Sequence, residues 1–141
     1  MQKHKNRLTI AVPCYNAADF IERCLSSLLS IDMDDLQILV IDNKSTDQTL
    51  DIVRSHDDKR LKIIENLINY NACYSYYRAY QNAETTYLAL IGADDIWVDQ
   101  HLSQRLDFMD THPEITVLSG QTEVFQYNNI NKTFRAAYRE Y

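Results

Sequence analysis

The amino-acid sequence predicts a three-layer α/β fold, in which helices cover both faces of a mostly parallel β-sheet. Short runs that are apolar on successive residues alternate along the chain with longer stretches whose apolar residues recur every three or four positions. The short runs lack the in-out alternation of a strand with one wet face, so their strands are expected to be covered on both sides. The repeated order of strand and helix is typical of a parallel sheet.

Five short segments are predicted to be strands. The first, residues 8–12, is ended by Pro13, which has no backbone N–H to donate to a ladder. The other four are residues 36–41, 61–64, 87–91 and 115–118. From residue 122 onward the alternation is weak, and we predict no element there.

The first two predicted helices follow the first two strands. Over residues 18–30 the apolar side chains fall on one helical face, and Asn16 is the expected N-cap. Ser45 or Thr46 can cap the second helix, with Asp47 at the positive end of its dipole. The apolar face of the first helix consists of Phe20, Ile21, Cys24, Leu25, Leu28 and Leu29.

Two more helices are predicted further along the chain. The third covers residues 71–83, and the fourth covers residues 101–111. Leu102, Leu106 and Met109 share the inward face of the fourth helix, and Pro113 follows its end.

Composition restricts the class of protein. A chain of 141 residues forms one compact domain, here residues 1–141, whose core needs neither disulfides nor a structural metal. The net charge is −6, and basic residues gather only at Lys3, Lys5 and Arg7, so nucleic acid is not an expected partner. Three cysteines without metal-ligand spacing indicate reduced thiols. The absence of a long apolar run or signal-peptide core predicts a cytoplasmic protein, free or at the inner membrane face.

In a parallel α/β sheet, ligands bind at the carboxyl ends of the strands. Tyr15 follows the first strand, where a planar base can pack on it, although the ring can instead pack on its own helix. Asp42 ends the second strand and can accept a hydrogen bond from an imide N–H such as N3 of uracil, or cap the next helix. Arg78 on the third helix can reach a phosphate or a base, or form a surface ion pair.

The end of the fourth strand carries two adjacent carboxylates, Asp94 and Asp95. Like charges side by side cost stability, and a hard divalent cation that bridges the phosphates of a nucleotide offsets that cost. Oxygen-only ligands favour Mg²⁺ or Mn²⁺. The alternative is a solvated acidic turn. Because polar groups follow three strands at one edge of the sheet, we favour the ligand site. The tyrosines between Tyr70 and Tyr80 can line a sugar or acceptor groove, or pack on the helix.

Three segments together resemble the family 2 glycosyltransferases. LTIAVPCYNAADFIERCLSSLL is similar to that family's opening, with its Pro-x-Tyr-Asn motif, and LQILVIDNKSTDQTLDIV is similar to its second signature loop. YLALIGADDIWVDQHLSQRLDFMDTHPEI is similar to its metal-binding motif and the following helix. The resemblance covers residues 8–120 and implies a GT-A, Rossmann-like fold, of which this chain would be the N-terminal, donor-binding part.

The resemblance also implies roles for the residues of these motifs. Pro13, Tyr15 and Asn16 would border the nucleobase, and Asp42 would bind its uracil-like edge. Asp94 would handle the ribose and, with Asp95, the cation and the diphosphate. Arg78 is a loose equivalent of the arginine in an Ala-Arg-Asn motif that is otherwise absent here.

Departures from the family pattern affect the metal site and the chemistry. Gly92 occupies the first position of the usual Asp-x-Asp motif, and Ala18 replaces an acidic residue common after Tyr-Asn. No residue is assigned as catalytic base.

The implied function is transfer of a sugar from a nucleotide-diphosphate donor, a UDP-sugar, to a glycan, a lipid-linked acceptor or another hydroxyl in cell-surface polysaccharide synthesis. The alternative is a non-catalytic nucleotide-sugar-binding module, or one that depends on a partner subunit. A nucleotidyltransferase would need a Gly-rich, basic loop after the first strand, and PCYNAAD contains neither Gly nor Lys.

Overall fold

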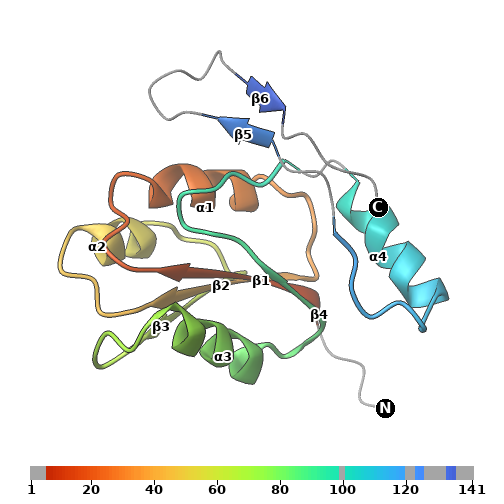
Figure 1. Ribbon diagram of the computed structural model, residues 1–141, viewed down its shortest axis with the longest axis horizontal. Coiled ribbons are helices and arrows are strands. Elements are labelled where there is room, and N and C mark those ends of the chain that lie inside the picture. Colours follow the sequence, from red (N-terminus) through yellow and green to blue (C-terminus); the bar gives the residue numbers. More distant parts are fainter. Residues whose placement is uncertain (1–5, 99–100, 120–122, 126–132, 136–141) are drawn as a thin grey trace. The chain divides into compact units, whose positions relative to one another are not determined.

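The computed structural model describes residues 6–98, 101–119, 123–125 and 133–135 (Figure 1). The chain divides into two compact units, Met1–Val98 and Asp99–Tyr141, where the sequence predicts a single domain. All the predicted site residues belong to the first unit. In chain order the elements are β1 (Asn6–Cys14), α1 (Ile21–Leu29), β2 (Leu36–Asp42), α2 (Thr49–Arg54), β3 (Leu61–Glu65), α3 (Ala72–Asn82), β4 (Thr85–Leu90), α4 (Leu102–Thr111), β5 (Glu123–Phe125) and β6 (Thr133–Arg135).

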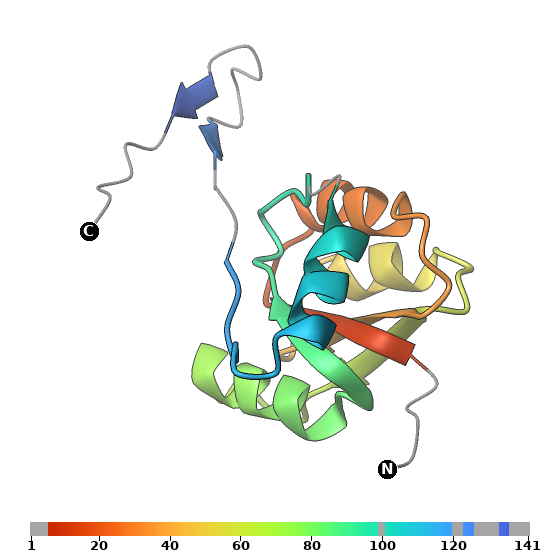
Figure 2. The ribbon, with the colours of Figure 1, turned by 90° about the vertical axis from the view of Figure 1, so that its right-hand side faces the viewer.

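The first unit is built on a four-stranded sheet with the order β3-β2-β1-β4, and each neighbouring pair is parallel. Helices α1 and α2 lie on one face of this sheet and α3 lies on the other (Figures 1 and 2). The predicted three-layer α/β fold is therefore confirmed. Strand β2 is buried at every position, as its continuous apolar run predicts for a central strand covered on both sides.

The two faces of the sheet are covered by different kinds of helix. Helix α1 buries a stripe of large side chains, among them Ile21, Leu25 and Leu28, at the predicted spacing of three and four residues. Helix α3 buries only Ser75 and Ala79. Ala79 joins a cluster of buried residues from β1 and β2. Because both buried residues are small, α3 approaches the sheet closely.

Both N-caps predicted for the first two helices are wrong. Helix α1 begins at Ile21, and its N-cap, Phe20, makes no side-chain capping bond. Helix α2 begins at Thr49 after Gln48, which makes none either. The side chains of Asn16 and Ser45, which were expected to cap these helices, are engaged in hydrogen bonds between two loops.

The predicted strand at residues 115–118 is also wrong. Among the described residues this segment forms no strand, and Val117 and Leu118 are exposed, because a β-prone segment becomes a strand only where another strand pairs with it. Strands β5 and β6 pair antiparallel in a region where the sequence predicts no element. Helix α4 is confirmed; Leu102 and Leu106 are buried and Met109 is half-buried.

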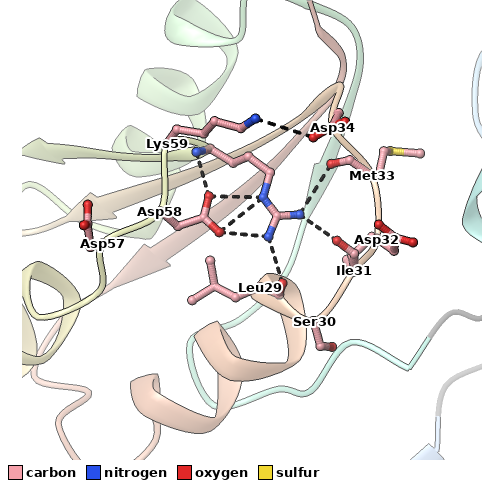
Figure 3. A pocket seen from close by; sticks show the side chains of 10 residues that line it. Leu29, Ser30, Ile31, Asp32, Met33, Asp34, Asp57, Asp58 and Lys59 are labelled. Atoms are coloured by element: carbon pink, nitrogen blue, oxygen red, sulfur yellow. Dashed lines mark hydrogen bonds and ion pairs between the residues drawn. The ribbon is translucent and has the colours of Figure 1, made fainter.

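At the amino edge of the sheet, residues 29–34 and 57–60, which lead into β2 and β3, line a common hollow (Figure 3). Arg60 ties these two segments together. Its guanidinium donates to the carbonyls of Leu29 and Ile31 at 2.8 and 2.6 Å and pairs with Asp58 at 2.9 Å. It thus satisfies carbonyls at and just beyond the end of α1, which have no helical partner. A hollow of about 650 Å³ surrounds this cluster, and we assign it a structural role.

Within the described part of the chain, none of the helices combines the length and the apolar character that a membrane crossing requires.

Candidate functional site

The loops that follow β1 and β2 are joined by hydrogen bonds at the carboxyl edge of the sheet. The Asn16 side-chain oxygen accepts from the backbone N–H of Thr46 at 2.8 Å, and the Asn16 N–H donates to Ser45 Oγ at 2.9 Å. Asn16 adopts a left-handed backbone with a φ of 48°, which asparagine tolerates better than most residues. Asn16 therefore fixes the loop that carries Tyr15.

A second pair of hydrogen bonds joins the loop after β1 to the residues at the start of α2. The buried Thr49 hydroxyl accepts from the N–H of Ala17 at 2.7 Å, and Asp47 accepts from the N–H of Ala18 at 3.0 Å. Asp47 also accepts from the backbone and the hydroxyl of Thr49. Desolvation would raise the pKa of Asp47, but these hydrogen bonds outweigh it and hold the pKa below its ordinary value.

Asp42 lies at the end of β2 and is 1% exposed. One of its carboxylate oxygens accepts from the N–H of Ser45 at 3.0 Å, and the other accepts from the thiol of Cys14 at 3.7 Å. Burial, and then the charge of Asp42, raise the pKa of Cys14, so this thiol stays protonated and can donate. Asp42 thus stabilises the turn from Asp42 to Ser45, and Asn43 is the next residue along the chain.

Asn43 connects the end of β2 with the loop between β3 and α3. Its side-chain oxygen accepts from Asn66 Nδ2 at 3.1 Å and from the N–H of Tyr70 at 3.2 Å. Its amide nitrogen donates to Asn69 Oδ1 at 2.6 Å. These bonds hold the loop 66–71 against the strand ends. Asn71 then accepts from the N–H of Tyr74 and is the N-cap of α3, which begins at Ala72.

A cavity of about 280 Å³ opens where these segments meet. No charged side chain lines it; two tyrosines and several neutral amide side chains are among its lining residues. The lining residues are Pro13, Cys14, Tyr15, Asn43, Asn69, Asn71, Ala72, Ser75 and Tyr76. A flat heterocycle with its own donors and acceptors suits such walls.

One polar atom of this lining has no partner. Ser75 is 1% exposed, and its hydroxyl makes no hydrogen bond in the structure. A buried hydroxyl without a partner costs free energy, and in native proteins it commonly marks a place that a ligand or water satisfies. Ser75 lines the cavity from the helix face that rests on the sheet.

After β4 the chain turns at Gly92, and one carboxylate oxygen from each of Asp94 and Asp95 lies close to this glycine. A Cβ built on Gly92 would lie 2.7 Å from Asp94 Oδ1 and 2.9 Å from Asp95 Oδ2. Beneath the turn, the Cys24 thiol donates to the Gly92 carbonyl at 3.5 Å. Burial, and then Asp95 and Asp94, raise the pKa of Cys24 to about 12. Both carboxylates are exposed, so water and a ligand can reach them.

Two exposed carboxylates beside one turn are the kind of ligand that a hard divalent cation takes. Magnesium is commonly held by one or two carboxylates together with substrate phosphates and water, so two oxygens from the protein suffice. Among the described residues no group of three or more ligand-type side chains gathers at one point. A cation at this turn would therefore depend on Asp94, Asp95 and the phosphates of a bound nucleotide.

The structure distributes the predicted site residues unevenly. Pro13 and Tyr15 line the cavity, whereas Asp42 is buried and is not among the lining residues. Asn16 is engaged between the loops. Arg78 is half-buried on α3 and is not among the cavity-lining residues.

Sequence reasoning missed the amide groups of the cavity and the hydroxyl of Ser75. Two features of the sequence could have identified Asn43 and Ser75. Asn43 directly follows a strand end, and Ser75 lies four residues before Ala79 on the face of α3 that must touch the sheet. The remaining polar groups of the cavity, Asn69 and Asn71, carry no such signal.

The tyrosines near α3 make two kinds of contact, and the sugar or acceptor groove expected for them stays a prediction. Tyr76 lines the cavity, although 45% of it is exposed. Tyr70 and Tyr74 pack on each other with ring centroids 4.3 Å apart.

In this parallel α/β protein a cavity follows β1 and β2 and an acidic turn follows β4, at the carboxyl edge where such sheets commonly bind ligands. The chain belongs to glycosyl transferase family 2, whose model matches residues 9–140. The predicted family and the GT-A fold are thereby confirmed.

Individual relatives agree with this assignment. The chain is 32% identical over 104 residues to the Escherichia coli UDP-Glc:alpha-D-GlcNAc-diphosphoundecaprenol beta-1,3-glucosyltransferase WfaP, with 74% of this chain and 41% of the relative covered. Staphylococcus aureus TarS 1–349 in complex with UDP matches with a TM-score of 0.70 and 29% identity, covering 76% of this chain and 33% of TarS 1–349. The mannosyltransferase PcManGT from Pyrobaculum calidifontis, in complex with GDP-Man and Mn²⁺, matches with a TM-score of 0.66 and 28% identity, covering 73% and 32%. The chain thus spans less than half the length of each.

Proposed function

We propose that this chain binds the nucleoside diphosphate of a UDP-sugar at the carboxyl edge of its sheet and serves in a glycosyltransferase. The sugar would pass to a hydroxyl of a glycan or lipid-linked acceptor during synthesis of a cell-surface polysaccharide. The observation that carries the proposal is the pairing of a neutral, aromatic-walled cavity after β1 and β2 with two converging carboxylates after β4.

The cavity suits the base. Tyr15 and Tyr76 offer aromatic surfaces, and the side chains of Asn69 and Asn71 offer both donors and acceptors. The buried hydroxyl of Ser75 adds one more group that a base can satisfy. The UDP complex of TarS, a structural relative, supports uridine as the nucleoside.

The acidic turn suits the diphosphate end. Asp94 and Asp95 would hold a divalent cation, and the Mn²⁺ complex of PcManGT supports that choice. When bound, such a cation neutralises negative charge on the leaving diphosphate. The residues of this chain position the donor: the joined loops hold Tyr15, and the bond from Cys24 to the Gly92 carbonyl holds the acidic turn against α1.

The acceptor side is inferred from the relatives alone. The name of WfaP specifies a diphosphoundecaprenol-linked acceptor, so a lipid-linked hydroxyl is the acceptor class that we propose. An enzyme with such an acceptor works at a membrane surface, so we propose the cytoplasmic membrane face as its location.

The test is calorimetric titration of the protein with UDP, first with Mn²⁺ and then with EDTA. We expect micromolar binding that weakens at least tenfold in EDTA, because the cation links the acidic turn to the diphosphate. Asp95→Ala should reproduce the effect of EDTA, whereas Asp58→Ala, which removes a carboxylate at the opposite edge of the sheet, should leave UDP affinity unchanged.

Absence of UDP binding under both conditions would contradict the proposal. Binding without hydrolysis of a UDP-sugar or transfer of its sugar would instead favour the non-catalytic module. Slow donor hydrolysis that Asp95→Ala abolishes would favour the transferase.

A further inference from the structure

The amide side chains that line the cavity have their orientations fixed by backbone donors. The Asn43 side-chain oxygen accepts from the N–H of Tyr70 at 3.2 Å. The Asn71 side-chain oxygen accepts from the N–H of Tyr74 at 2.9 Å. Because a backbone N–H can only donate, Asn43 Nδ2 is the donor in its 2.6 Å bond to Asn69 Oδ1. The three amide oxygens of the lining therefore already accept hydrogen bonds from the protein.

Three of the lining side chains are buried: Cys14 and Asn43 are each 5% exposed, and Ser75 is 1% exposed. The Cys14 thiol has acceptors at 3.7 Å, the Ile41 carbonyl and the carboxylate of Asp42. Both polar atoms of Asn43 have partners as well. Among these three buried side chains, only Ser75 has a polar atom without a partner. Its hydroxyl is thus the buried group of the lining that a ligand can satisfy.

The hydroxyl of Ser75 favours a ligand that accepts its proton. A hydroxyl can donate one hydrogen bond and accept others, but no acceptor among the described residues takes the proton of Ser75. A ligand N–H that donates to Ser75 would leave this proton buried and unpaired, which costs free energy. A ligand carbonyl accepts the proton and removes that cost. The hydroxyl therefore distinguishes a carbonyl from an amino group.

Uracil and cytosine differ in this respect at ring position 4, where uracil has a carbonyl and cytosine has an amino group. Position 4 lies across the ring from N1, which carries the ribose. The ribose and diphosphate of a bound nucleotide extend toward the open side of the cavity, so position 4 reaches its least exposed part. Ser75 is the least exposed of the lining residues that the structure describes.

Helix α3 holds this hydroxyl in place. Ala79, one turn after Ser75 on the same face of the helix, packs in the buried cluster with Ala11, Leu39 and Ile41. Because small residues make this contact, the helix approaches the sheet closely and its position is well defined. A hydrogen-bond donor on such a rigid surface can select among bases by the group that each base presents.

We propose that Ser75 is a specificity-determining residue of the donor site, whose hydroxyl donates to the carbonyl at position 4 of uracil and disfavours the amino group of cytosine. The proposal rests on the proposed function, which places the base of the donor in this cavity. It assigns part of the choice of nucleotide to a neutral side chain of α3.

The experiment is calorimetric titration of the full chain with UDP and with CDP at one fixed concentration of Mn²⁺. We expect the wild type to prefer UDP by about tenfold or more, because a site with a buried donor rejects a ligand that cannot accept from it. Ser75→Ala should lose about tenfold in affinity for UDP but change by less than about threefold for CDP, so that the preference nearly disappears. Its melting temperature should stay at the wild-type value, since the hydroxyl has no partner in the protein.

Cys73→Ala is the matched control. Cys73 lies on the same helix two residues before Ser75, is exposed, and is not among the lining residues. Its replacement should change the affinity for either nucleotide by less than about twofold.

A second measurement changes the ligand and needs no variant. In 4-thio-UDP a sulfur atom, which is a weaker acceptor, replaces the oxygen at position 4. The wild type should bind it about fivefold or more less tightly than UDP. In Ser75→Ala this difference should shrink, because the donor that distinguishes the two ligands is gone.

The outcomes separate the inference from the proposed function. A wild type that binds neither UDP nor CDP refutes the proposed function. A wild type that binds UDP and CDP equally, or UDP and 4-thio-UDP equally, overturns the inference and leaves the nucleotide site standing. Equal losses for UDP and CDP in Ser75→Ala, or no loss for UDP, overturn it as well, because the hydroxyl then does not read the base.

Discussion

Replacing Thr49 by valine should destabilise the protein by removing a single hydroxyl from the junction of two loops. Thr49 is fully buried, and its hydroxyl accepts from the Ala17 N–H at 2.7 Å while donating to Asp47. Valine fills nearly the same volume and has a similar helix propensity, so the change leaves the packing and α2 itself intact. It leaves the N–H of Ala17, a residue only 7% exposed, without its acceptor.

An unsatisfied buried donor costs about 1–3 kcal/mol, so we expect Thr49→Val to lower the free energy of unfolding by about 2 kcal/mol. With a urea m-value of about 2 kcal/mol/M, the midpoint of unfolding should fall by about 1 M with the m-value unchanged. Affinity for UDP should fall too, because the released loop carries Tyr15. Thr46→Val, the same substitution at an exposed residue of the loop that precedes α2, should shift stability by less than about 0.5 kcal/mol. Equal midpoints for Thr49→Val and the wild type would refute this account of the loop junction.

Three further substitutions test other parts of the structure. Arg60→Met should lower the free energy of unfolding by about 2 kcal/mol in urea denaturation, because the carbonyls of Leu29 and Ile31 lose a charged donor, and should leave UDP affinity unchanged. Ser75→Ala should lower UDP affinity about tenfold in calorimetry without loss of stability, because the hydroxyl has no partner in the protein. The pKa of Asp47 in the folded protein is depressed, so its contribution to stability is present above its ordinary value of 3.8 and is lost as the pH falls through the folded value. Asp47→Asn should therefore be less stable than the wild type at neutral pH, and this difference should shrink in acid; a constant difference would contradict the assignment.

The sequence predicted the sheet well because each of its strands carries its own signal. The run from Leu36 to Ile41 is apolar at nearly every position, and burial on both faces is the environment that such a run requires. The same reasoning failed at residues 115–118, where the apolar run is present but no strand among the described residues pairs with it. Apolar composition records the tendency to form a strand, whereas hydrogen bonds from a neighbour decide whether one forms.

Helix caps were predicted less well because polar side chains near a helix start have competing partners. Ser45 and Asn16 are both good capping residues, and a single-sequence reading assigns each to the nearest helix. In the fold, parallel neighbours β1 and β2 bring their following loops side by side, so Ser45 and Asn16 bond across the gap. The choice between a local and a distant partner depends on strand order, which the sequence alone does not specify.

The residues of the candidate site also fall into those that local sequence could predict and those that depend on the fold. Tyr15 and the aspartate pair were found because they follow strands, and strand ends in a parallel sheet share an edge. Ser75 was missed because its meaning depends on which face of α3 touches the sheet. Gly92 was noticed only as a missing aspartate, since a sequence shows which side chain is absent but not what fills its space. Two carboxylate oxygens, Asp94 Oδ1 and Asp95 Oδ2, lie 2.7 and 2.9 Å from the point where a Cβ would stand.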